Sequence, residues 1–592
     1  MTRNLNRTLS RTLSLAAAAG LAATGVAGLP AAGAPATTAV LISGQFGPDG
    51  NVVQTSTEVP VTVRDDVPGI EKPAEPAPRP RSKLDPKLAK ATTGRQRVVV
   101  TFVQDQKMPR LPDLDASLPR TAPANVETLR RSDAIVNDVI ARRSPAYQQL
   151  KTDLARLDVR VLETFWLIKG MVVDAPAAAL PGLAQRDDVS YVEPVDSGTP
   201  PPADSDPDND EADARALMHT DPYFGRQTGY VGILDTGARR THTLITPASA
   251  SFFEDLTTTT NPDPNDDCWN HGTSTFAIMG GNSNLGDAFR GITNLTVDSF
   301  KVYPAGCQNL DVGAAQRAFA RAVEVGDRVI VAEMQAGGDE LSALSVAADS
   351  AFDAGAAVIA ANGNNGPNAS TVNVPAAAQK VLGIGAVDLK AQTTPDFQSR
   401  GPTGDFRIKP DVQAPTNVET ASNASDTATQ VFTGTSAATP HAAGAAALFR
   451  NATPAMPAGG VYAMLLASGN ASGVDNTHGA GMISLQPTGV FWQAQTTVSN
   501  KQVVDIPAVD AAGPGNHRFN LAIWWPEAPA THNDIDVSLV DPNGVVRASS
   551  LSVNGVFERV ALTGGITAGR WTVRITGYQV TGTQTVYAAW TF

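Results

Sequence analysis

The sequence has few cysteines and few basic residues, and no long hydrophobic run follows its first 36 residues. Lysine and arginine number 45 against 58 aspartates and glutamates, which gives a formal net charge of -13 over 592 residues. The sequence contains no block of Lys and Arg residues of the kind that binds along a phosphate backbone, so nucleic acid is not expected as a partner. The length predicts about three or four domains.

The chain also lacks simple metal-site motifs. Its two cysteines, Cys268 and Cys307, form no CxxC pair, and two cysteines alone cannot complete a tetrahedral zinc site. The absence of HExxH argues against a metalloprotease. The cysteines form either one disulfide or two buried free thiols, and the sequence leaves both open.

The first 36 residues are similar to an export signal. Three arginines within the first eleven residues precede an apolar stretch from Leu13 to about Val26, and the small-residue segment "LPAAGAPATT" follows. Glycines and a proline interrupt the apolar stretch, whereas a membrane-spanning helix needs about 20 predominantly apolar residues. We therefore expect a secreted protein, extracellular or periplasmic, without a membrane anchor.

Changes in composition divide the remaining chain. Residues 37–94 have little pattern and include a proline-rich linker, whereas residues 95–196 show the pattern of a small α+β unit. In that unit "VRVLETFWLIKGMVVDAP" predicts one strand, and "SPAYQQLKTDLARL" predicts a helix. Residues 197–214 are proline-rich and then acidic, which predicts a flexible connector open to proteolysis.

Alternating aspartates in this connector raise the question of a calcium loop. An EF-hand loop needs Gly at its sixth position and Glu at its twelfth, where this sequence has Asn209 and Arg215. A solvated linker is therefore the preferred interpretation of the alternating Asp204, Asp206, Asp208 and Asp210.

Residues 215–490 alternate apolar strands such as "TGYVGILDTG" and "KVLGIGAV" with helices such as "GAAQRAFARAVEVG". This alternation predicts an α/β fold with a parallel sheet covered on both faces, and the chemistry of such folds gathers at the carboxyl ends of the strands. Residues 491–592 instead repeat apolar residues in steps of two, which predicts a β-sandwich. An exposed Trp524 or Trp525 could form a binding surface there.

Three polar residues stand at ends of the predicted elements. Asp235 ends a strand, and His271 and Ser436 each begin a helical stretch. Each alone fits an ordinary turn or cap. Together they supply a nucleophile, a base and an acid that orients the base. Their order, Asp then His then Ser, differs from that of α/β-hydrolases, and Ala438 stands where GxSxG needs Gly.

The blocks around these residues carry a family resemblance. "GILDTGARRTH", "NHGTSTFAIMGG" and "GTSAATPHAAGAAAL" resemble the aspartate, histidine and serine blocks of subtilisin-like serine proteases, and the resemblance covers about 215–490. It implies a serine endopeptidase that cleaves polypeptides through an acyl-enzyme. His242 matches the family's histidine after the aspartate, and "FQSRGPTGDFRIKPDVQAP" matches the segment before the serine block. His441 lies about 140° around the helix from Ser436, so we interpret it as structural.

The reaction also needs donors for the negative charge that develops on the carbonyl oxygen. The backbone N–H of Ser436, at a helix start, is one. "AANGNNG" resembles the segment that carries the family's side-chain donor, which places that role on Asn364 and not on Asn362 or Asn365.

Two positions depart from the family pattern. Ser274 stands where the family usually has a second histidine. The segment "AEMQAGG" resembles the substrate-binding strand and gives Gln335, Ala336, Gly337 and Gly338 as substrate-binding residues, whose backbone could pair with an extended peptide. No charged residue occurs at the aligned pocket positions, which predicts an apolar or broad preference.

The unit at 95–196 is similar to inhibitor-type propeptides of subtilisin-like enzymes. The resemblance implies a precursor whose own propeptide assists folding and blocks the cleft until the chain is cut within 197–214. The alternative is an accessory domain that stays attached. The C-terminal β domain weakly resembles those appended to secreted subtilases.

No cofactor is required for the expected chemistry. The resemblance implies that calcium can stabilise the enzyme, with "NPDPNDD" as a candidate site whose ligands the sequence does not assign. We expect a monomer. The alternative function is an inactive subtilase-like or surface-binding protein that acts through its C-terminal domain.

Overall fold

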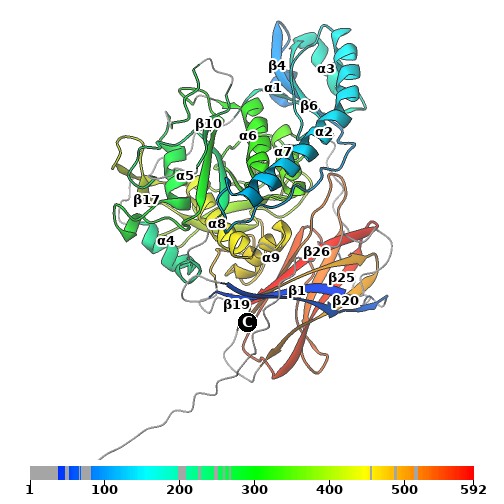
Figure 1. Ribbon diagram of the computed structural model, residues 1–592. Helices are drawn as coiled ribbons and strands as arrows, with labels where there is room; N and C mark the ends of the chain where they lie inside the picture. Colours follow the sequence, from blue (N-terminus) through cyan, green and yellow to red (C-terminus); the bar gives the residue numbers. More distant parts are fainter. Residues whose placement is uncertain are drawn as a thin grey trace, which may run out of the picture. The chain divides into compact units, whose positions relative to one another are not determined.

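The structure is a computed structural model of the chain (Figure 1). The predicted export signal and the aspartates Asp204, Asp206 and Asp208 lie outside the described residues. Within the described part, no helix is both long and apolar enough to cross a membrane. The structure describes residues 38–46, 52–65, 67, 72, 82–197, 209–224, 229–245, 251–257, 261–265, 268–307, 309–453, 456–485, 490–511 and 518–591.

A seven-stranded sheet organises the central unit, and all its neighbouring strands are parallel. The parallel sheet predicted from the alternating pattern is thus confirmed, whereas its two edge strands were not predicted. In spatial order the strands are β10 (Phe253–Asp255), β11 (Thr296–Lys301), β9 (Tyr230–Asp235), β13 (Val329–Ala332), β14 (Ala357–Ala361), β15 (Leu382–Asp388) and β16 (Val412–Thr416).

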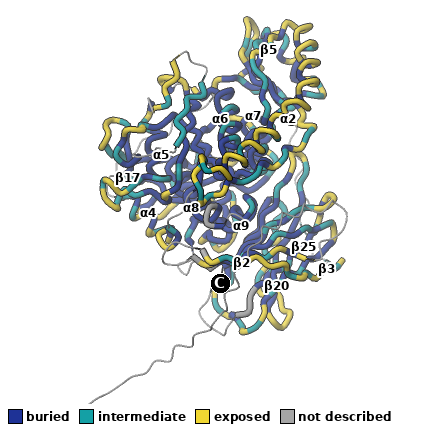
Figure 2. The backbone as a smooth tube through the Cα atoms, in the orientation of Figure 1, coloured by how far each residue is buried: buried dark blue, intermediate teal, exposed yellow. Residues whose placement is uncertain are grey.

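Helices cover both faces of this sheet, because its strands are apolar on both sides. One face packs against α5 (His271–Gly280) and α8 (Gly434–Ala452), and the other against α6 (Val312–Val325) and α7 (Ala343–Asp353). Figure 2 shows the central strands buried beneath them. Smaller elements of this unit are η2 (Asp221–Tyr223), η3 (Asp287–Phe289), β12 (Leu310–Asp311), β17 (Val418–Ala421), β18 (Thr429–Phe432) and α9 (Ala458–Ser468).

The N-terminal α+β unit has a four-stranded antiparallel sheet in the order β5-β6-β4-β7. The predicted single strand is instead a hairpin, because the Tyr147 hydroxyl donates to Phe165 O (2.6 Å) and accepts from Gly170 N (3.1 Å) at its turn. The predicted helix begins earlier, at Pro123. The elements are α1 (Pro86–Ala89), β4 (Arg95–Phe102), α2 (Pro123–Ala155), β5 (Arg160–Thr164), β6 (Gly170–Pro176), η1 (Ala177–Ala179), α3 (Leu180–Ala184), β7 (Val189–Pro194) and β8 (Asp196–Ser197).

The end of the predicted connector is helical, which corrects its boundary. Asp210 caps α4 (Glu211–Met218) by accepting hydrogen bonds from Ala212 N (2.8 Å) and Asp213 N (3.2 Å). The Asp213 side chain accepts in return from Asp210 N (3.4 Å), so the acidic pattern forms a capping box. Residues 198–208 of the connector lie outside the described residues.

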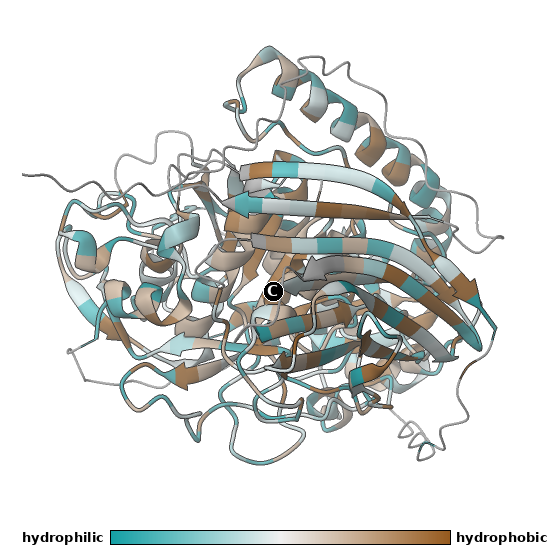
Figure 3. Ribbon diagram, turned by 90° about the horizontal axis from the view of Figure 1, so that it is seen from below, coloured by the Kyte–Doolittle hydropathy of each residue, from teal (hydrophilic) through white to brown (hydrophobic). Residues whose placement is uncertain are grey.

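The C-terminal unit contains two antiparallel sheets, in which apolar and polar residues alternate (Figure 3). Both Trp524 and Trp525 are only 1% exposed, so neither provides the exposed binding surface that the sequence had left possible. Trp524 instead packs against Phe352 and Tyr462 of the central unit. The strands are β19 (Val490–Ser499), β20 (Gln502–Ala511), β21 (Arg518–Trp524), β22 (Asp534–Val540), β23 (Val546–Ser550), β24 (Phe557–Thr563), β25 (Gly569–Gln579) and β26 (Thr583–Thr591).

Three N-terminal strands join these two sheets, although residues 37–94 have too little sequence pattern to assign secondary structure. They are β1 (Thr38–Phe46), β2 (Val52–Pro60) and β3 (Thr62–Arg64). The sheet orders are β2-β1-β19-β26-β21-β24 and β23-β22-β25-β20-β3. The sequence did not predict them, because β1 and β3 pair with strands more than four hundred residues away in the sequence.

Candidate active site

Asp235 and His271 meet at the carboxyl edge of the sheet. The Nδ1–H of His271 lies 2.8 Å from Asp235 Oδ1 and 2.9 Å from Oδ2. Thr275 Oγ1 donates to Asp235 Oδ2 (2.8 Å), and Thr236 N donates to Oδ1 (2.6 Å). Asp235 is 1% exposed. These donors fix the carboxylate, and the carboxylate fixes the tautomer and orientation of the imidazole.

Two features hold His271 at the start of α5. Cys268 and Cys307, with Cα atoms 5.6 Å apart, are joined as a disulfide in the structure. This bond links the loop before α5 to the loop that follows β11. The ring of Phe432 packs edge-on against the imidazole, with centroids 4.9 Å apart. The imidazole is therefore held by a ring contact as well as at Nδ1.

Ser436 lies in the first turn of α8, directly after a tight backbone turn at Gly434 (φ +83°). Its Oγ accepts a hydrogen bond from Gln335 Nε2 (3.1 Å), and no hydrogen bond between described residues joins it to His271. Ser436 nevertheless lines the same cavity as His271. This cavity has a volume of about 10 Å³, room for about one water, and is lined by Asp235, Thr236, Trp269, His271, Tyr303, Glu333, Gln335 and Ser436.

The side-chain amide of Asn364 lies beside the start of α8. Its Oδ1 accepts from Thr435 N (2.9 Å) and Thr435 Oγ1 (3.1 Å). Its Nδ2 donates to no acceptor among the described residues. The neighbouring asparagines are used structurally, since Asn362 Nδ2 donates to Ser399 O (2.7 Å) and Asn365 Nδ2 to Asn373 Oδ1 (2.7 Å). Asn364 is thus the asparagine whose donor group is available.

The predicted substrate-binding residues divide into two pairs. Gln335 and Ala336 are buried, and Ala336 exchanges backbone hydrogen bonds with Val374 (3.2 and 2.9 Å). Gly337 and Gly338 are exposed, and nothing lies within 4 Å of the position a Cβ on Gly337 would take. A peptide backbone can therefore reach the two glycines, but the edge of Ala336 is already paired.

Glu333 is a residue of this site that the sequence reasoning missed. It follows β13, and the register that pairs Ala332 with Leu234 places it beside Asp235 on the neighbouring strand. It is 3% exposed, and neither carboxyl oxygen has a well-formed hydrogen bond among the described residues. Burial and the charge of Asp235 raise the pKa of Glu333 well above its usual value, and the Ser436 hydroxyl lowers it in part. The sequence signal that could have identified Glu333 is its place as a carboxyl residue at the end of the apolar run "VIVAE".

Three other singled-out residues are structural. His441 Nδ1 donates to Ala437 O (2.7 Å) and Nε2 lies 3.1 Å from Glu211 Oε2, so its ring is engaged away from Ser436, as expected. His242 Nε2 donates to Ala428 O (2.9 Å). Ser274 Oγ, at the position of the family's second histidine, donates to Ala421 O (2.7 Å).

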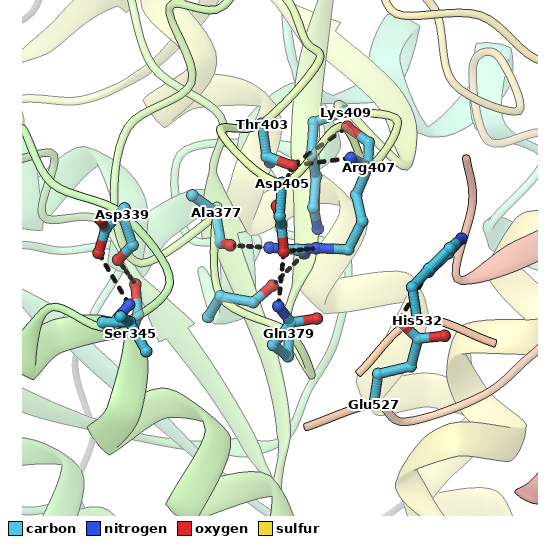
Figure 4. Close-up of polar contacts among 12 residues, drawn as sticks. Asp339, Ser345, Ala377, Gln379, Thr403, Asp405, Arg407, Lys409, Glu527 and His532 are labelled. Carbon is cyan, nitrogen blue, oxygen red and sulfur yellow. Dashed lines mark hydrogen bonds and ion pairs between the residues drawn. The ribbon is translucent and has the colours of Figure 1, made fainter. Parts of the chain in front are cut away.

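The segment before the serine block is held by a buried arginine (Figure 4). Arg407 donates to Asp405 Oδ2 (2.9 Å), Ala378 O (2.8 Å) and Ala377 O (2.5 Å). Gln379 Nε2 donates to the same Asp405 oxygen (2.7 Å). Although burial opposes it, Arg407 lowers the pKa of Asp405 below its usual value. The carboxylate thereby stays charged and fixes the loop beside β15 and β16.

Within the described residues, no group of three or more His, Cys, Asp or Glu side chains is arranged to hold a metal ion. In the candidate calcium segment 261–267, Asp263 Oδ1 accepts from Asn265 N (3.0 Å) and Asn265 Nδ2 (2.7 Å). Residues 266 and 267 lie outside the described part. The expected calcium site is not tested by this arrangement.

The sequence of the chain is similar to that of known proteins. The subtilase family model matches residues 227–481. Subtilisin DY of Bacillus licheniformis is 30% identical over 262 residues, covering 43% of this chain and 89% of that protein. Serine protease AprX of Bacillus subtilis (strain 168) is 32% identical over 185 residues, but only 26% of this chain and 42% of AprX are covered.

The extracellular serine proteinase of Thermus sp. (strain Rt41A) is 28% identical over 289 residues, covering 48% of this chain and 66% of that protein. The identity with subtilisin DY extends over nearly the whole of that protein. The chain therefore belongs to the subtilase family of serine proteases.

Proposed function

We propose that this protein is a secreted serine endopeptidase, made as a precursor, in which Ser436 is the nucleophile, His271 the base and Asp235 the acid that orients it. The observation that carries the proposal is the double contact of His271 Nδ1 with Asp235, beside a cavity that Ser436 also lines. Because the Nδ1–H of His271 donates its hydrogen bond to Asp235, Nε2 is the unprotonated nitrogen that can act as the base.

In the proposed reaction the Ser436 hydroxyl turns from Gln335 toward His271 Nε2, which takes its proton as Oγ attacks the peptide carbonyl. Asn364 Nδ2 and the backbone N–H of Ser436, which lacks an intrahelical partner in the first turn of α8, donate to the oxyanion. His271 then gives the proton to the leaving amine. A water molecule, deprotonated by His271, then attacks the acyl-enzyme ester. The ester bond breaks, and His271 returns the proton to Ser436 Oγ. The residues of this chain supply all proton transfers.

For the substrate we propose an extended polypeptide chain that pairs with the exposed backbone of Gly337 and Gly338. No charged side chain occurs among Ala336, Gly337, Asn362 and Asn365, which supports an apolar or broad preference. A strong preference for Arg or Lys before the cleaved bond would contradict this specificity.

The contacts of the N-terminal unit with helices α6 and α7 of the central unit support the precursor proposal. Glu193 Oε1 accepts from Ala343 N at the start of α7 (2.5 Å), and Arg317 of α6 binds Glu163 (2.5 Å). β8 pairs antiparallel with β12 and leads directly into the connector. This arrangement suits a propeptide that holds the connector near the cleft until it is cut. The Thermus relative is an extracellular serine proteinase, which supports secretion.

A peptide-library digest by the processed protein, with Ser436→Ala as the control, tests the proposal. We expect cleavage by the wild type only, and an uncut precursor for purified Ser436→Ala. Asn364→Ala should lower the rate about 10²- to 10³-fold. Cleavage by Ser436→Ala contradicts the proposed nucleophile, and normal processing of that variant in isolation contradicts self-maturation.

A further inference from the structure

Three strands at the start of the described chain belong structurally to the C-terminal unit. β1 pairs with β19 from Val40↔Gln495 to Gln45↔Val490, and β3 pairs with β20 (Figure 1). β1 is an inner strand, since β2 covers its other edge. Its Ile42 is 3% exposed. Removing these strands would expose apolar residues and the edges of both sheets.

A buried cation adds to this attachment. The Lys72 side chain is 4% exposed, and its Nζ donates to Asp534 Oδ1 (2.6 Å) and to Asp536 Oδ1. It also lies over the ring of Tyr578, 4.7 Å from the centroid. Burial raises the pKa of Asp536 to about 6, and Lys72 opposes that rise. Without Lys72, two buried carboxylates would face each other.

A second attachment is made by residues 103–122, here called the arm, which join β4 to α2. The arm crosses the edge where β9, β13 and β14 begin, opposite to the edge that carries Asp235. Leu111 N donates to Ala354 O (2.9 Å), and the Tyr230 hydroxyl donates to Leu118 O (2.9 Å). Leu114 packs directly against Gly326: a Cβ added to Gly326 would lie only 2.5 Å from Leu114 Cδ1.

Charges of both signs fix the arm. Arg120 donates to Asp327 Oδ1 (2.8 Å) and to both oxygens of Asp298, and its guanidinium lies 3.9 Å from the Tyr230 ring centroid. Both aspartate side chains are fully buried. Burial and the neighbouring Asp298 raise the pKa of Asp327 well above its usual value, and Arg120 opposes that rise.

The residue after Asp327, Arg328, binds a charge of the opposite sign on the arm. Asp113 of the arm accepts from Arg328 Nε (2.6 Å) and Arg450 Nη2 (3.2 Å). Although burial opposes it, the surrounding arginines lower the pKa of Asp113 to about 2. Consecutive residues Asp327 and Arg328 thus bind arm charges of opposite sign, which fixes the register of the arm.

We infer that the chain before the connector stays bound after the connector is cut, so that the processed protein is a complex of two chains. The two attachments, β1–β3 with Lys72 and the arm, both lie away from the cleft and do not use residues 198–208. Dissociation would leave buried charges unpaired on the remaining chain, and each such loss costs roughly 100-fold or more in binding. The N-terminal unit therefore remains at high local concentration beside the cleft even when it is displaced from it.

The test uses full-length Ser436→Ala with a site for an added sequence-specific protease within 198–208. After cutting, we expect both fragments to elute together in gel filtration and to remain together on dilution to nanomolar concentration. Separation of the fragments in native buffer would overturn the inference. Because the variant lacks the nucleophile and the cut comes from another enzyme, the result does not depend on the proposed catalytic function.

Two variants locate the attachments. Arg120→Ala and Lys72→Ala should each raise the dissociation rate of the cut complex at least tenfold, and together more than either alone. Arg131→Ala, an exposed arginine on α2, is the matched control and should leave the rate unchanged. Circular dichroism before cutting checks that each variant folds. Equal dissociation rates for the Ser436→Ala parent and both variants would show that these charges do not hold the fragment.

Discussion

The buried carboxyl of Glu333 provides a quantitative test of the electrostatics at the site. Burial and Asp235 raise its pKa in the folded protein, so the folded state binds this proton more tightly than the unfolded state. Its contribution to stability is present in full below the unfolded pKa of about 4.5. It is lost as the pH rises toward the folded pKa.

The loss amounts to about 1.4 kcal/mol of unfolding free energy per pH unit, because one proton is involved. Glu333→Gln removes this titration. Relative to its parent, the variant should therefore gain about 1.4 kcal/mol per pH unit as the pH rises from about 5 toward the folded pKa. Burying the glutamine amide changes the unfolding free energy of the variant by an amount that does not depend on pH. The pH dependence of the difference between variant and parent is therefore unaffected.

The assay is urea unfolding in the Ser436→Ala background, which prevents self-digestion, followed by tryptophan fluorescence at a series of pH values. Removing the Ser436 hydroxyl removes the contact that lowers the pKa of Glu333, so the predicted direction is unchanged. Glu58→Gln, at an exposed glutamate of β2, is the matched control. A pH-independent difference between Glu333→Gln and its parent would refute the reasoning.

Three further predictions concern other contacts. Thr275→Val removes the hydroxyl that donates to Asp235, and kcat/KM should fall about 10- to 100-fold, the worth of a hydrogen bond to a charged group; unchanged peptide hydrolysis kinetics would exclude this positioning role. Burial raises the pKa of Glu193 to about 8, so docking of the N-terminal unit should weaken by up to about tenfold per pH unit above about pH 4.5, until about pH 8. The protection factor of the amide bound to Glu193 measures this, and a slope that persists in Glu193→Gln would contradict it. Arg407→Leu leaves Asp405 without its cation and should lower stability by about 3 kcal/mol in thermal unfolding, whereas an unchanged Tm would contradict the role of the pair.

Local sequence patterns predicted the parallel sheet of the central unit, and the resemblance of three blocks to subtilisin-like serine proteases supplied the candidate triad. Strand ends place Asp235 at the carboxyl edge of the sheet, and the order of the three blocks predicted which histidine would accompany it. The asparagine chosen from "AANGNNG" is the one whose Nδ2 is available, while its neighbours Asn362 and Asn365 hold the loop. These features were predictable because each depends on a short segment.

The missed features depend on pairing between distant segments. Glu333 lies beside Asp235 only because β13 is inserted next to β9, an order that the chain does not reveal. The strands of residues 38–64 have little pattern of their own, and their partners lie beyond residue 490. The position of the arm was likewise not predictable, because Arg120 binds two aspartates that come from separate segments of the chain.

Labelling by a serine-directed fluorophosphonate tests the central claim most directly. In the processed protein, peptide mass spectrometry should find the label on Ser436, and His271→Ala should slow labelling at least a thousandfold. Ser436→Ala should abolish it. A label on another serine, or a rate unaffected by His271→Ala, would contradict the assignment of nucleophile and base.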